Sequence, residues 1–257
     1  MSAQGYYEQI SKVLESIHTR ELAKIQQAGE WFAHAIAAGR RVYLFGSGHS
    51  VIPVMDVFPR YGSFVGFYPL YDPRLMWHNV VGPGGARELL WLERREGYIA
   101  NFLQSFALEG GDCMVVFSHG GMNAAPIEAA IYARERGLKV VTVSSLANAA
   151  VSKANHSSGN RLSDVADIAI DNCVAPEDSQ VEVGWPEKVA AGSTMASVFV
   201  AMSLVAETGA RLAERKFKPP TFVSPNVAGL AKDHNQQVFE AYAEKWFERA
   251  RQKHAVV

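Results

Sequence analysis

Apolar residues recur at helical spacing through the first part of the chain. Between residues 6 and 38 they fall three or four positions apart, which is the repeat of a helix with one buried face. Gly39 follows directly, and glycine is the residue type that most often ends a helix. The pattern predicts an N-terminal helix of about thirty residues that covers a sheet face or packs against a partner subunit.

From residue 42 onward, short apolar runs alternate with helical segments. The runs CMVVF and KVVTV are continuously apolar, which is typical of parallel strands buried on both faces. The predicted strands cover residues 42–45, 64–68, 113–117, 139–144 and 167–170. The predicted helices cover residues 51–61, 87–107, 124–136, 193–214 and 235–253. Residues 69–86 and 171–192 are interpreted as loops, the first of them long and rich in Pro, Gly and aromatic residues.

This order of elements predicts the α/β class. Strands that alternate with helices form right-handed βαβ units and a mostly parallel sheet covered on both faces. No repeat of fixed period and no linker divides the 257 residues, so we predict a single domain. It would comprise an N-terminal helix (1–39), a core (40–214) and a C-terminal extension with a helix (215–257).

The composition of the chain argues against some classes of binding partner. Hydrophobic residues make up 48% of the chain, charged residues 20%, and the formal net charge is −1. Lys and Arg form no run longer than a pair, which argues against a nucleic-acid partner. No apolar window of about 18 residues and no hydrophobic leader is visible, so we expect a cytoplasmic protein without a membrane partner. Cys113 and Cys173 lack metal-ligand spacing and are expected to be free thiols.

Three polar loops follow predicted strands: GSGHS (46–50), SHGGMN (118–123) and SSLANAA (144–150). In an open parallel sheet, ligands bind beyond the carboxyl ends of the strands, where helix N-termini present free N–H groups. Glycines let the backbone approach an anion closely, and serine hydroxyls add donors. The sequence therefore predicts a site for phosphate or another tetrahedral anion, although none of the loops matches a Walker A loop or G-x-G-x-x-G. The candidate binding residues are Ser47, Gly48, His49, Ser50, Ser118, His119, Gly120, Asn123, Ser144 and Ser145.

Acid/base chemistry next to a carbonyl needs a carboxylate or imidazole and a second proton-transferring group. The candidates are Asp56, Glu93, Glu96, Asp178, Glu182, His49, His78, His119, His156 and His234. Of these, Glu93, His234, Asp56 and His156 are the catalytic residues that we predict. Glu93 and Glu96 lie three positions apart in a predicted helix, so we expect both on one side of it. A purely structural role competes in each case: a solvated helix face for the acids, a loop position for His156, and a helix-capping neighbourhood for His234.

Metal and hydrolase chemistry are not predicted. The chain has no H-E-x-x-H or C-x-x-C spacing, so we expect no metal and no cofactor. It also has no G-x-S-x-G elbow, which argues against a Ser-His-Asp hydrolase.

Several ordered motifs resemble the sugar isomerase (SIS) domain. They are FGSGHS, the run LERREGY (92–98) and the segment VVFSHGGMNAAPIEAAIYARERGLKVVTVSSL (115–146). Residues 155–173 and 224–242 are similar to one branch of that family, uncharacterised phosphosugar-binding proteins described as phosphoheptose isomerases. The resemblance covers residues 40–242. It implies a three-layer α/β/α sandwich with a five-stranded parallel sheet, phosphosugar binding, and a homo-oligomer (a dimer or tetramer) with shared sites.

The second loop departs from the family pattern, which usually reads Ser-x-Ser-Gly-x-Thr. Ser118 keeps the first serine, Gly120 replaces the second, and Asn123 stands where threonine is usual. A lost hydroxyl removes a hydrogen bond to a charged group, which contributes about 1.5–3 kcal/mol where it is well made. The anion can therefore be a phosphate, a sulfonate or a carboxylate.

The resemblance also implies roles for the acid/base candidates. The related N-acetylmuramic acid 6-phosphate etherases carry an acid/base glutamate at a position that matches Glu93. Phosphoheptose isomerases have an acidic residue placed like Asp56, and SIS isomerases use a late histidine, here His234, that sometimes reaches a neighbouring subunit's site. We expect an isomerase that interconverts aldose and ketose forms of an anionic sugar. A sugar-phosphate lyase of the etherase kind and a non-catalytic sugar-phosphate sensor are the alternatives.

Overall fold

A five-stranded parallel sheet forms the centre of the molecule. The computed structural model describes residues 3–254, except for the side chains of residues 250 and 252–254. The strand order is β2-β1-β3-β4-β5, all parallel. The strands are β1 (Val42–Gly46), β2 (Phe67–Pro69), β3 (Cys113–Phe117), β4 (Lys139–Ser144) and β5 (Ile168–Asp171). The predicted α/β class and five-stranded sheet are confirmed.

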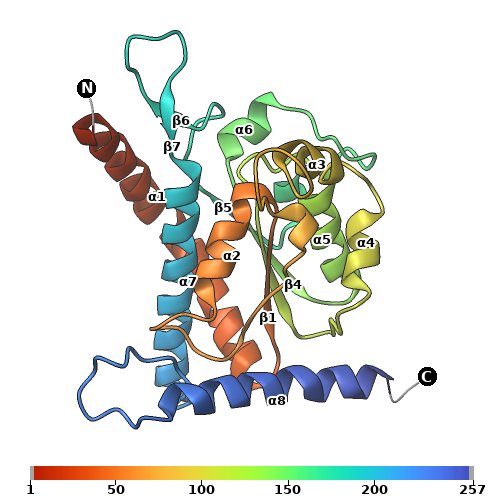
Figure 1. Cartoon of the computed structure of the whole chain (residues 1–257), viewed down its shortest axis with the longest axis vertical. Coiled ribbons are helices and arrows are strands. Elements are labelled where there is room, and N and C mark those ends of the chain that lie inside the picture. The colour runs from red at the N-terminus through yellow and green to blue at the C-terminus, as the bar shows by residue number, and fades with distance from the viewer. Residues whose placement is uncertain (1–2, 255–257) are drawn as a thin grey trace.

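Helices cover both faces of the sheet (Figure 1). On one face α1 (Ala3–Ala37), α2 (Val51–Val57) and α7 (Ser193–Glu214) share a core with Val42 and Leu44 of β1. On the other face α4 (Tyr98–Leu103) and α5 (Ala124–Glu135) share a second core with Tyr43 and Phe45. Successive residues of β1 alternate between the two cores, and all of them are buried. The continuously apolar strands are thus those of a sheet buried on both faces.

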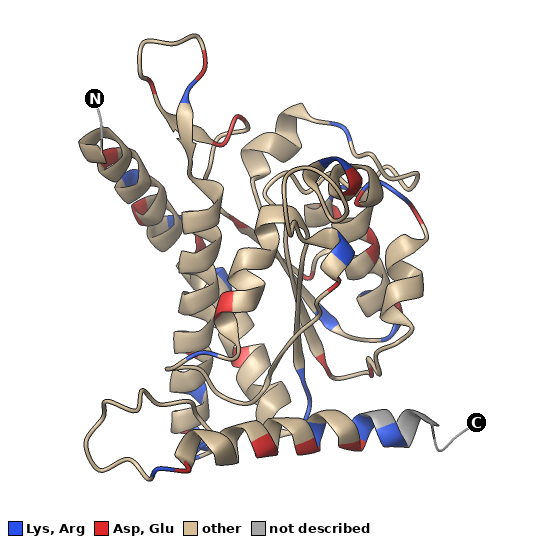
Figure 2. Cartoon of the chain, in the orientation of Figure 1, with Lys and Arg blue, Asp and Glu red and all other residues tan. Residues whose placement is uncertain are grey.

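The long helices α1 and α7 pack against each other. Helix α1 ends at Ala37, and Gly39 takes the left-handed conformation (φ 72°) that a helix end favours. Acidic and basic side chains are interspersed along α1 (Figure 2). Helix α7 is long and apolar enough to cross a membrane by length and composition, and the core helix of a soluble protein passes the same test. Here its apolar face, with Val200 and Leu204, lies in the core.

Helix α8 (His234–His254) crosses the amino edge of the sheet (Figure 1). The guanidinium of Arg249 donates to the carboxylate of Asp112, which is fully buried just before β3. The ring of Tyr242 stacks on Tyr68 of β2, with ring centroids 5.1 Å apart. Because α8 closes the amino edge, the carboxyl edge is left to the loops.

Several local features differ from the sequence prediction: the helix predicted at 51–61 ends at Val57, and the strand predicted at 64–68 lies at Phe67–Pro69. The predicted helix 87–107 is two helices, α3 (Ala86–Leu92) and α4, because Gly97 between them has φ 82°. The predicted loop 171–192 contains a hairpin of β6 (Ser179–Val181) and β7 (Val189–Ala191), so β5 is not the last strand. A short helix, α6 (Leu146–Val151), follows β4. Three short 3₁₀ helices complete the described elements: η1 (Gly48–Ser50), η2 (Pro73–Leu75) and η3 (Leu162–Val165).

The strands at 113–117 and 139–144 and the helix at 193–214 agree with their predicted bounds. The division into 1–39, 40–214 and 215–257 within one domain stays a prediction.

Candidate functional site

The three polar loops lie along one edge of the sheet. Strands β1, β3 and β4 are neighbours in the sheet and all parallel, so their carboxyl ends lie side by side. The loops that begin at Ser47, Ser118 and Ser145 leave from these ends and lead into η1 and α2, α5 and α6 (Figure 1). The shared edge was predicted from the sequence, and binding of an anion there stays a prediction.

The first loop turns Ser47 inward and His49 outward. Gly46 is necessary because a Cβ at this position would lie 2.2 Å from the carbonyl oxygen of Ser50. The Ser50 N–H donates to the backbone carbonyl oxygen of Ser47 at 3.1 Å, which closes the turn. Ser47 is only 8% exposed, whereas His49 is exposed and meets the ring of Trp77 edge-on, with centroids 4.5 Å apart. Gly48 lies beside the same indole.

Glu93 is the carboxylate that the structure brings to these loops. It follows the last residue of α3 and is 7% exposed. The Ser47 hydroxyl donates to its Oε2 at 3.0 Å, and the Asn123 amide nitrogen donates to its Oε1 at 2.7 Å. Burial raises the pKa of Glu93, and the Ser47 hydrogen bond and the nearby Arg94 offset part of that rise. A buried carboxylate with a raised pKa is suited to proton transfer in both directions.

Glu96 does not share the surroundings of Glu93. Helix α3 ends at Leu92, so the expectation that both glutamates face one side of a helix was wrong. The Glu96 carboxylate accepts from the N–H of Ser157 at 2.6 Å and from its hydroxyl at 2.5 Å. These bonds lower the pKa of Glu96, which is exposed. Glu96 therefore anchors a loop, whereas Glu93 lies at the strand ends.

The second loop is held by its own backbone and by the third loop. Ser118 Oγ accepts from the Gly121 N–H at 3.2 Å. The carbonyl oxygen of His119 accepts from the Ser145 N–H at 2.9 Å, and that of Gly120 accepts from the Asn148 side-chain amide at 2.8 Å. The carbonyls of His119 and Gly120 thus point toward the third loop.

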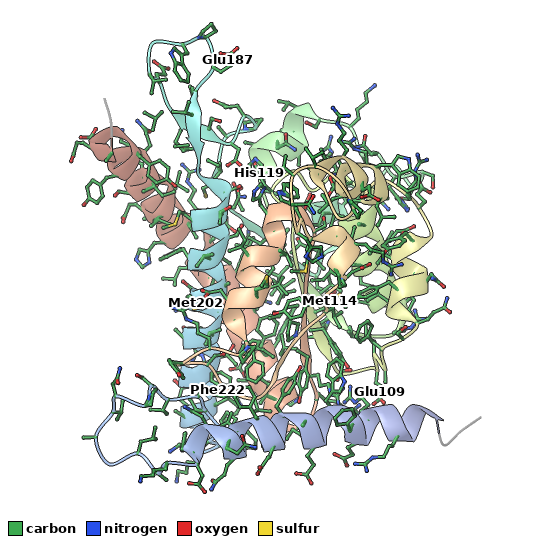
Figure 3. All side chains as sticks on the ribbon, viewed as in Figure 1. Glu109, Met114, His119, Glu187, Met202 and Phe222 are labelled. Carbon is green, nitrogen blue, oxygen red and sulfur yellow. The ribbon has the colours of Figure 1, made fainter. Side chains whose placement is uncertain are left out.

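The tautomer of His119 follows from its neighbours. The Val174 N–H donates to Oδ1 of Asn172 at 3.1 Å, so the Asn172 amide nitrogen faces His119 Nδ1, 3.1 Å away. Nδ1 therefore accepts, and Nε2 carries the proton. This Nε2 is buried and has no hydrogen-bond partner among the residues that the structure describes, an uncommon state for a buried donor. Figure 3 shows His119 at the end of the sheet opposite Glu109 and Phe222.

The third loop has structural hydrogen bonds. Ser145 is fully buried, and its oxygen caps α6 by accepting from the Asn148 N–H at 3.0 Å. Its hydroxyl hydrogen is directed to the carbonyl of Val174 at 2.6 Å. Ser144 is also buried and lies against Gly121. Anion binding by Ser144 or Ser145 stays a prediction with these bonds in place.

His156 lies in a loop next to the second loop. Its Nδ1 is 2.8 Å from the Ser158 hydroxyl, and its Nε2 is 3.9 Å from Glu96 and 3.8 Å from Glu128. Glu128 in turn accepts from the N–H of Gly97 at the start of α4. His156 thus faces carboxylates that hold the loop and the start of α4.

Two predicted acid/base residues lie away from Glu93 within this chain. Asp56 is in the last turn of α2 and forms an ion pair with Arg60. His234 begins α8 at the amino edge, with Nε2 2.8 Å from the carbonyl oxygen of Thr221. Figure 1 shows α8 at the end of the sheet opposite the polar loops. Among the described residues, the hydrogen bonds to the Glu93 carboxylate come from Ser47 and Asn123, and neither Asp56 nor His234 of the same chain bonds to it.

As far as the structure describes their side chains, the two cysteines and the metal-ligating residue types form no further site. Cys113 and Cys173 are free, and burial raises the pKa of the Cys113 thiol to about 12. Within the described part of the chain, no group of three or more His, Cys, Asp or Glu side chains is placed to hold a metal ion.

The sequence interpretation missed two asparagines at this edge. Asn155 donates from its amide to Oδ1 of Asn123 at 2.9 Å, and Asn172 orients His119. Their partners lie 32 and 53 positions away in the chain. No local pattern links such distant residues, so only the fold reveals the pairs.

The fold and these contacts define an α/β protein with a small polar site at the carboxyl edge of a parallel sheet. The model of the SIS domain family matches residues 5–145. The UPF0309 protein lin2794 of Listeria innocua is 34% identical over 242 residues, which cover 94% of this chain and 96% of that protein. The UPF0309 protein TTE0306 of Caldanaerobacter subterraneus is 34% identical over 244 residues, covering 93% of this chain and 97% of that protein. The chain belongs to the SIS domain family and, within it, to the UPF0309 proteins.

A solved structure supports the fold. A phosphoheptose isomerase from Francisella tularensis superposes with a TM-score of 0.54 at 14% sequence identity, covering 81% of this chain and 96% of that chain. The resemblance to the SIS domain in the sequence motifs is confirmed.

Proposed function

We propose that this protein is an isomerase that interconverts the aldose and ketose forms of an anionic sugar, with a sugar phosphate as the first candidate. Membership of the SIS domain family supports a sugar ligand. A protein of the same fold is named phosphoheptose isomerase, which supports a phosphorylated one. The observation that carries the proposal is the buried carboxylate of Glu93 between Ser47 and Asn123.

Glu93 transfers the proton in this proposal. The carboxylate removes the proton from the carbon next to the carbonyl, the freed electron pair forms the enediol double bond, and the carbonyl oxygen gains a proton. Glu93 then gives its proton to the former carbonyl carbon while the hydroxyl on the first carbon loses its proton to the second proton-transferring group and becomes the new carbonyl, so that protons and electrons balance and no oxidant is needed. Burial, which raises the pKa of Glu93, makes the group a better base while still allowing it to give the proton back.

The anion would rest on fewer side chains than the loop sequences contain. The single hydroxyl hydrogen of Ser47 and the amide nitrogen of Asn123 are directed to Glu93. The hydroxyls of Ser50 and Ser118 and the backbone N–H groups around Gly48 and Gly120 are the remaining donors. The imidazoles of His49 and His119 lie in the same two loops and can add a donor.

His234 would act from a second subunit. Its position at the amino edge separates it from Glu93 of its own chain. In this proposal the protein self-associates as a dimer or tetramer, and His234 of one subunit assists ring opening or oxygen protonation in another. Asp56 and His156 are the reserve candidates for this second proton-transferring group.

The test begins with a thermal-shift screen against phosphorylated and sulfonated sugars. A ligand that binds only the folded protein stabilises it by RT ln(1 + [L]/Kd), so a binder raises the melting temperature. Each binder is then incubated in heavy water with wild type, with Glu93→Gln, and with Glu88→Gln as a control. Glu88 lies on the exposed side of α3, the helix that ends just before Glu93, and its carboxylate accepts from the Gly84 N–H. The glutamine in Glu93→Gln can still accept the hydrogen bond from the Asn123 amide and can donate one to the Ser47 hydroxyl oxygen. The fold and ligand binding should therefore persist.

We expect solvent exchange of the proton next to the carbonyl and an isomeric product with wild type and Glu88→Gln, and neither with Glu93→Gln. Wild-type rates in Glu93→Gln would refute the role of Glu93. Cleavage of the substrate into two products would instead indicate a lyase that uses the same glutamate. Binding without exchange in the wild type would indicate a sensor.

A further inference from the structure

Three side chains form a line from the protein interior to its surface. Glu93 is buried, Asn123 is half-buried and Asn155 is exposed. Asn123 donates from Nδ2 to Glu93 Oε1 at 2.7 Å, and Asn155 donates from Nδ2 to Asn123 Oδ1 at 2.9 Å. The line thus joins a carboxylate to two amides in series.

The chemistry of the groups fixes the direction of each amide. An ionised carboxylate only accepts hydrogen bonds, so the Asn123 nitrogen must face Glu93 and the Asn123 oxygen must face outward. The outward oxygen needs a donor, and the Asn155 nitrogen supplies it. If the Asn123 amide turned over, its oxygen would face the carboxylate, and its nitrogen would face the nitrogen of Asn155.

We propose that Asn123 and Asn155 are positioning residues. Asn155 keeps the Asn123 amide oriented so that the Asn123 nitrogen donates to Glu93, and the Asn123 side chain therefore binds the carboxylate instead of the anion. The proposal rests on the proposed acid/base role of Glu93. It gives a physical reason for the departure from the family loop, in which a threonine hydroxyl usually stands at this position. An amide can donate to Glu93 and accept from Asn155 at the same time, at opposite ends of one rigid group.

Asn155 can be replaced without moving its backbone. Its N–H donates to the carbonyl oxygen of Met122 at 2.8 Å, and two positions later Ser157 is held by Glu96. Both bonds are independent of the side chain at position 155. Substitutions at position 155 should therefore change the hydrogen-bond donor to Asn123 Oδ1 and leave the loop backbone in place.

Other titratable groups lie near these three side chains, and their effect on the titration of Glu93 must be distinguished from that of the two amides. Arg94 is adjacent in the chain and acts on the Glu93 charge. Further titratable groups in the same or neighbouring segments include His49, His119, His156, Glu96, Glu128, Arg95 and Lys153. Because a new charge at position 155 would also act on Glu93 through space, the experiment needs a version without the amide at position 123.

The experiment is a double-mutant cycle read by the titration of Glu93. The proteins are wild type, Asn155→Ala, Asn155→Asp, Asn123→Ala and the double variant Asn123→Ala/Asn155→Asp. The carboxyl carbon of Glu93 is followed by NMR from pH 4 to 9 in protein labelled with ¹³C at glutamate carboxyls, and its signal is assigned by its loss in Glu93→Gln. The ionised carboxylate introduced by Asn155→Asp presents only acceptors, so it should turn the Asn123 amide over and disfavour the charged form of Glu93.

We expect the Glu93 midpoint to rise by about half to one pH unit in Asn155→Asp, the shift that one net hydrogen bond can supply. A smaller rise is expected in Asn155→Ala, because water can replace the lost donor. In the Asn123→Ala background the Asn155→Asp substitution should have little further effect at about 0.5 M salt, where the direct charge effect is screened. Glu93 midpoints equal to wild type in Asn155→Ala and Asn155→Asp, or an equal shift from Asn155→Asp with and without Asn123, would overturn the proposal. Because the NMR readout needs no substrate, an inactive protein that shows the expected shifts would refute the isomerase function and leave the positioning role intact.

Discussion

Replacement of Gly46 by alanine should disrupt the first loop far more than its small size suggests. A Cβ at this position would lie 2.2 Å from the carbonyl oxygen and 2.6 Å from the carbonyl carbon of Ser50. Both are backbone atoms, so no side-chain rotation can relieve the overlap. The turn must open instead, which breaks the bond from the Ser50 N–H to Ser47 and moves the Ser47 hydroxyl away from Glu93. We expect Gly46→Ala to lower the free energy of unfolding by roughly 3 kcal/mol or more.

Gly39 provides the matched control. It has a positive φ of 72°, but nothing lies within 4 Å of a Cβ built on it. Gly39→Ala should therefore cost only about 1–2 kcal/mol, the cost of a left-handed backbone for an L-residue. Urea unfolding of both variants measures the two values, and ligand-induced stabilisation measures the state of the site. If Gly46→Ala cost no more than Gly39→Ala, the tight contact between Gly46 and Ser50 would not be what shapes this loop.

Two further predictions concern buried charges. Because burial raises the pKa of Glu93 above its ordinary value of 4.5, the folded state holds that proton more tightly, and stability from this group is lost as pH rises from about 4.5 through the raised value. Urea unfolding across this range should show Glu93→Gln gaining stability relative to wild type as pH rises, and a difference that is constant with pH would contradict the raised value. Arg249→Met leaves the fully buried Asp112 carboxylate without its cation and should cost about 3–5 kcal/mol. Arg40→Met breaks a pair with Glu109 whose side chains are 40% and 43% exposed and should cost under about 1 kcal/mol, so equal costs in the two variants would contradict the argument.

Those parts of the fold that depend on local sequence were predictable. Continuous apolar runs mark strands buried on both faces, and the strands at 113–117 and 139–144 appear with the predicted bounds. The break at Gly97 was missed because apolar residues continue at helical spacing on both sides of it. The β6–β7 hairpin was missed because its strands are three residues each, too short to produce a detectable alternation.

The site was predictable at the level of loops and not of individual groups. The sequence placed three polar loops at one edge because parallel strands end there together. Residue pattern alone did not separate Glu93 from Glu96, which only the resemblance to the etherases did, since the distinction depends on where α3 ends and on what then faces the two side chains. The sequence indicated His234 as a candidate without showing which subunit's site the residue would reach, and α8 lies across the opposite edge of the sheet in its own chain. Such placements depend on tertiary contacts far apart in sequence.

Polar composition also overstates how many groups in a loop are free to bind a ligand. Ser47, Asn123 and Ser145 are all residues that a sequence would assign to an anion, yet each already donates within the protein, to Glu93 in two cases and to Val174 in the third. A hydroxyl has one hydrogen, so the bonds of Ser47 and Ser145 each use the only side-chain donor, whereas the bond from Asn123 uses one of its two amide hydrogens. In the proposed anion site, backbone N–H groups would then be the main donors, and their positions are set by the turn at Gly46 and by the hydrogen bonds that the carbonyls of the second loop accept from Ser145 and Asn148. Selectivity for the anionic group would accordingly depend on the shape of these turns, while the Ser47 and Asn123 side chains hold the Glu93 carboxylate in place.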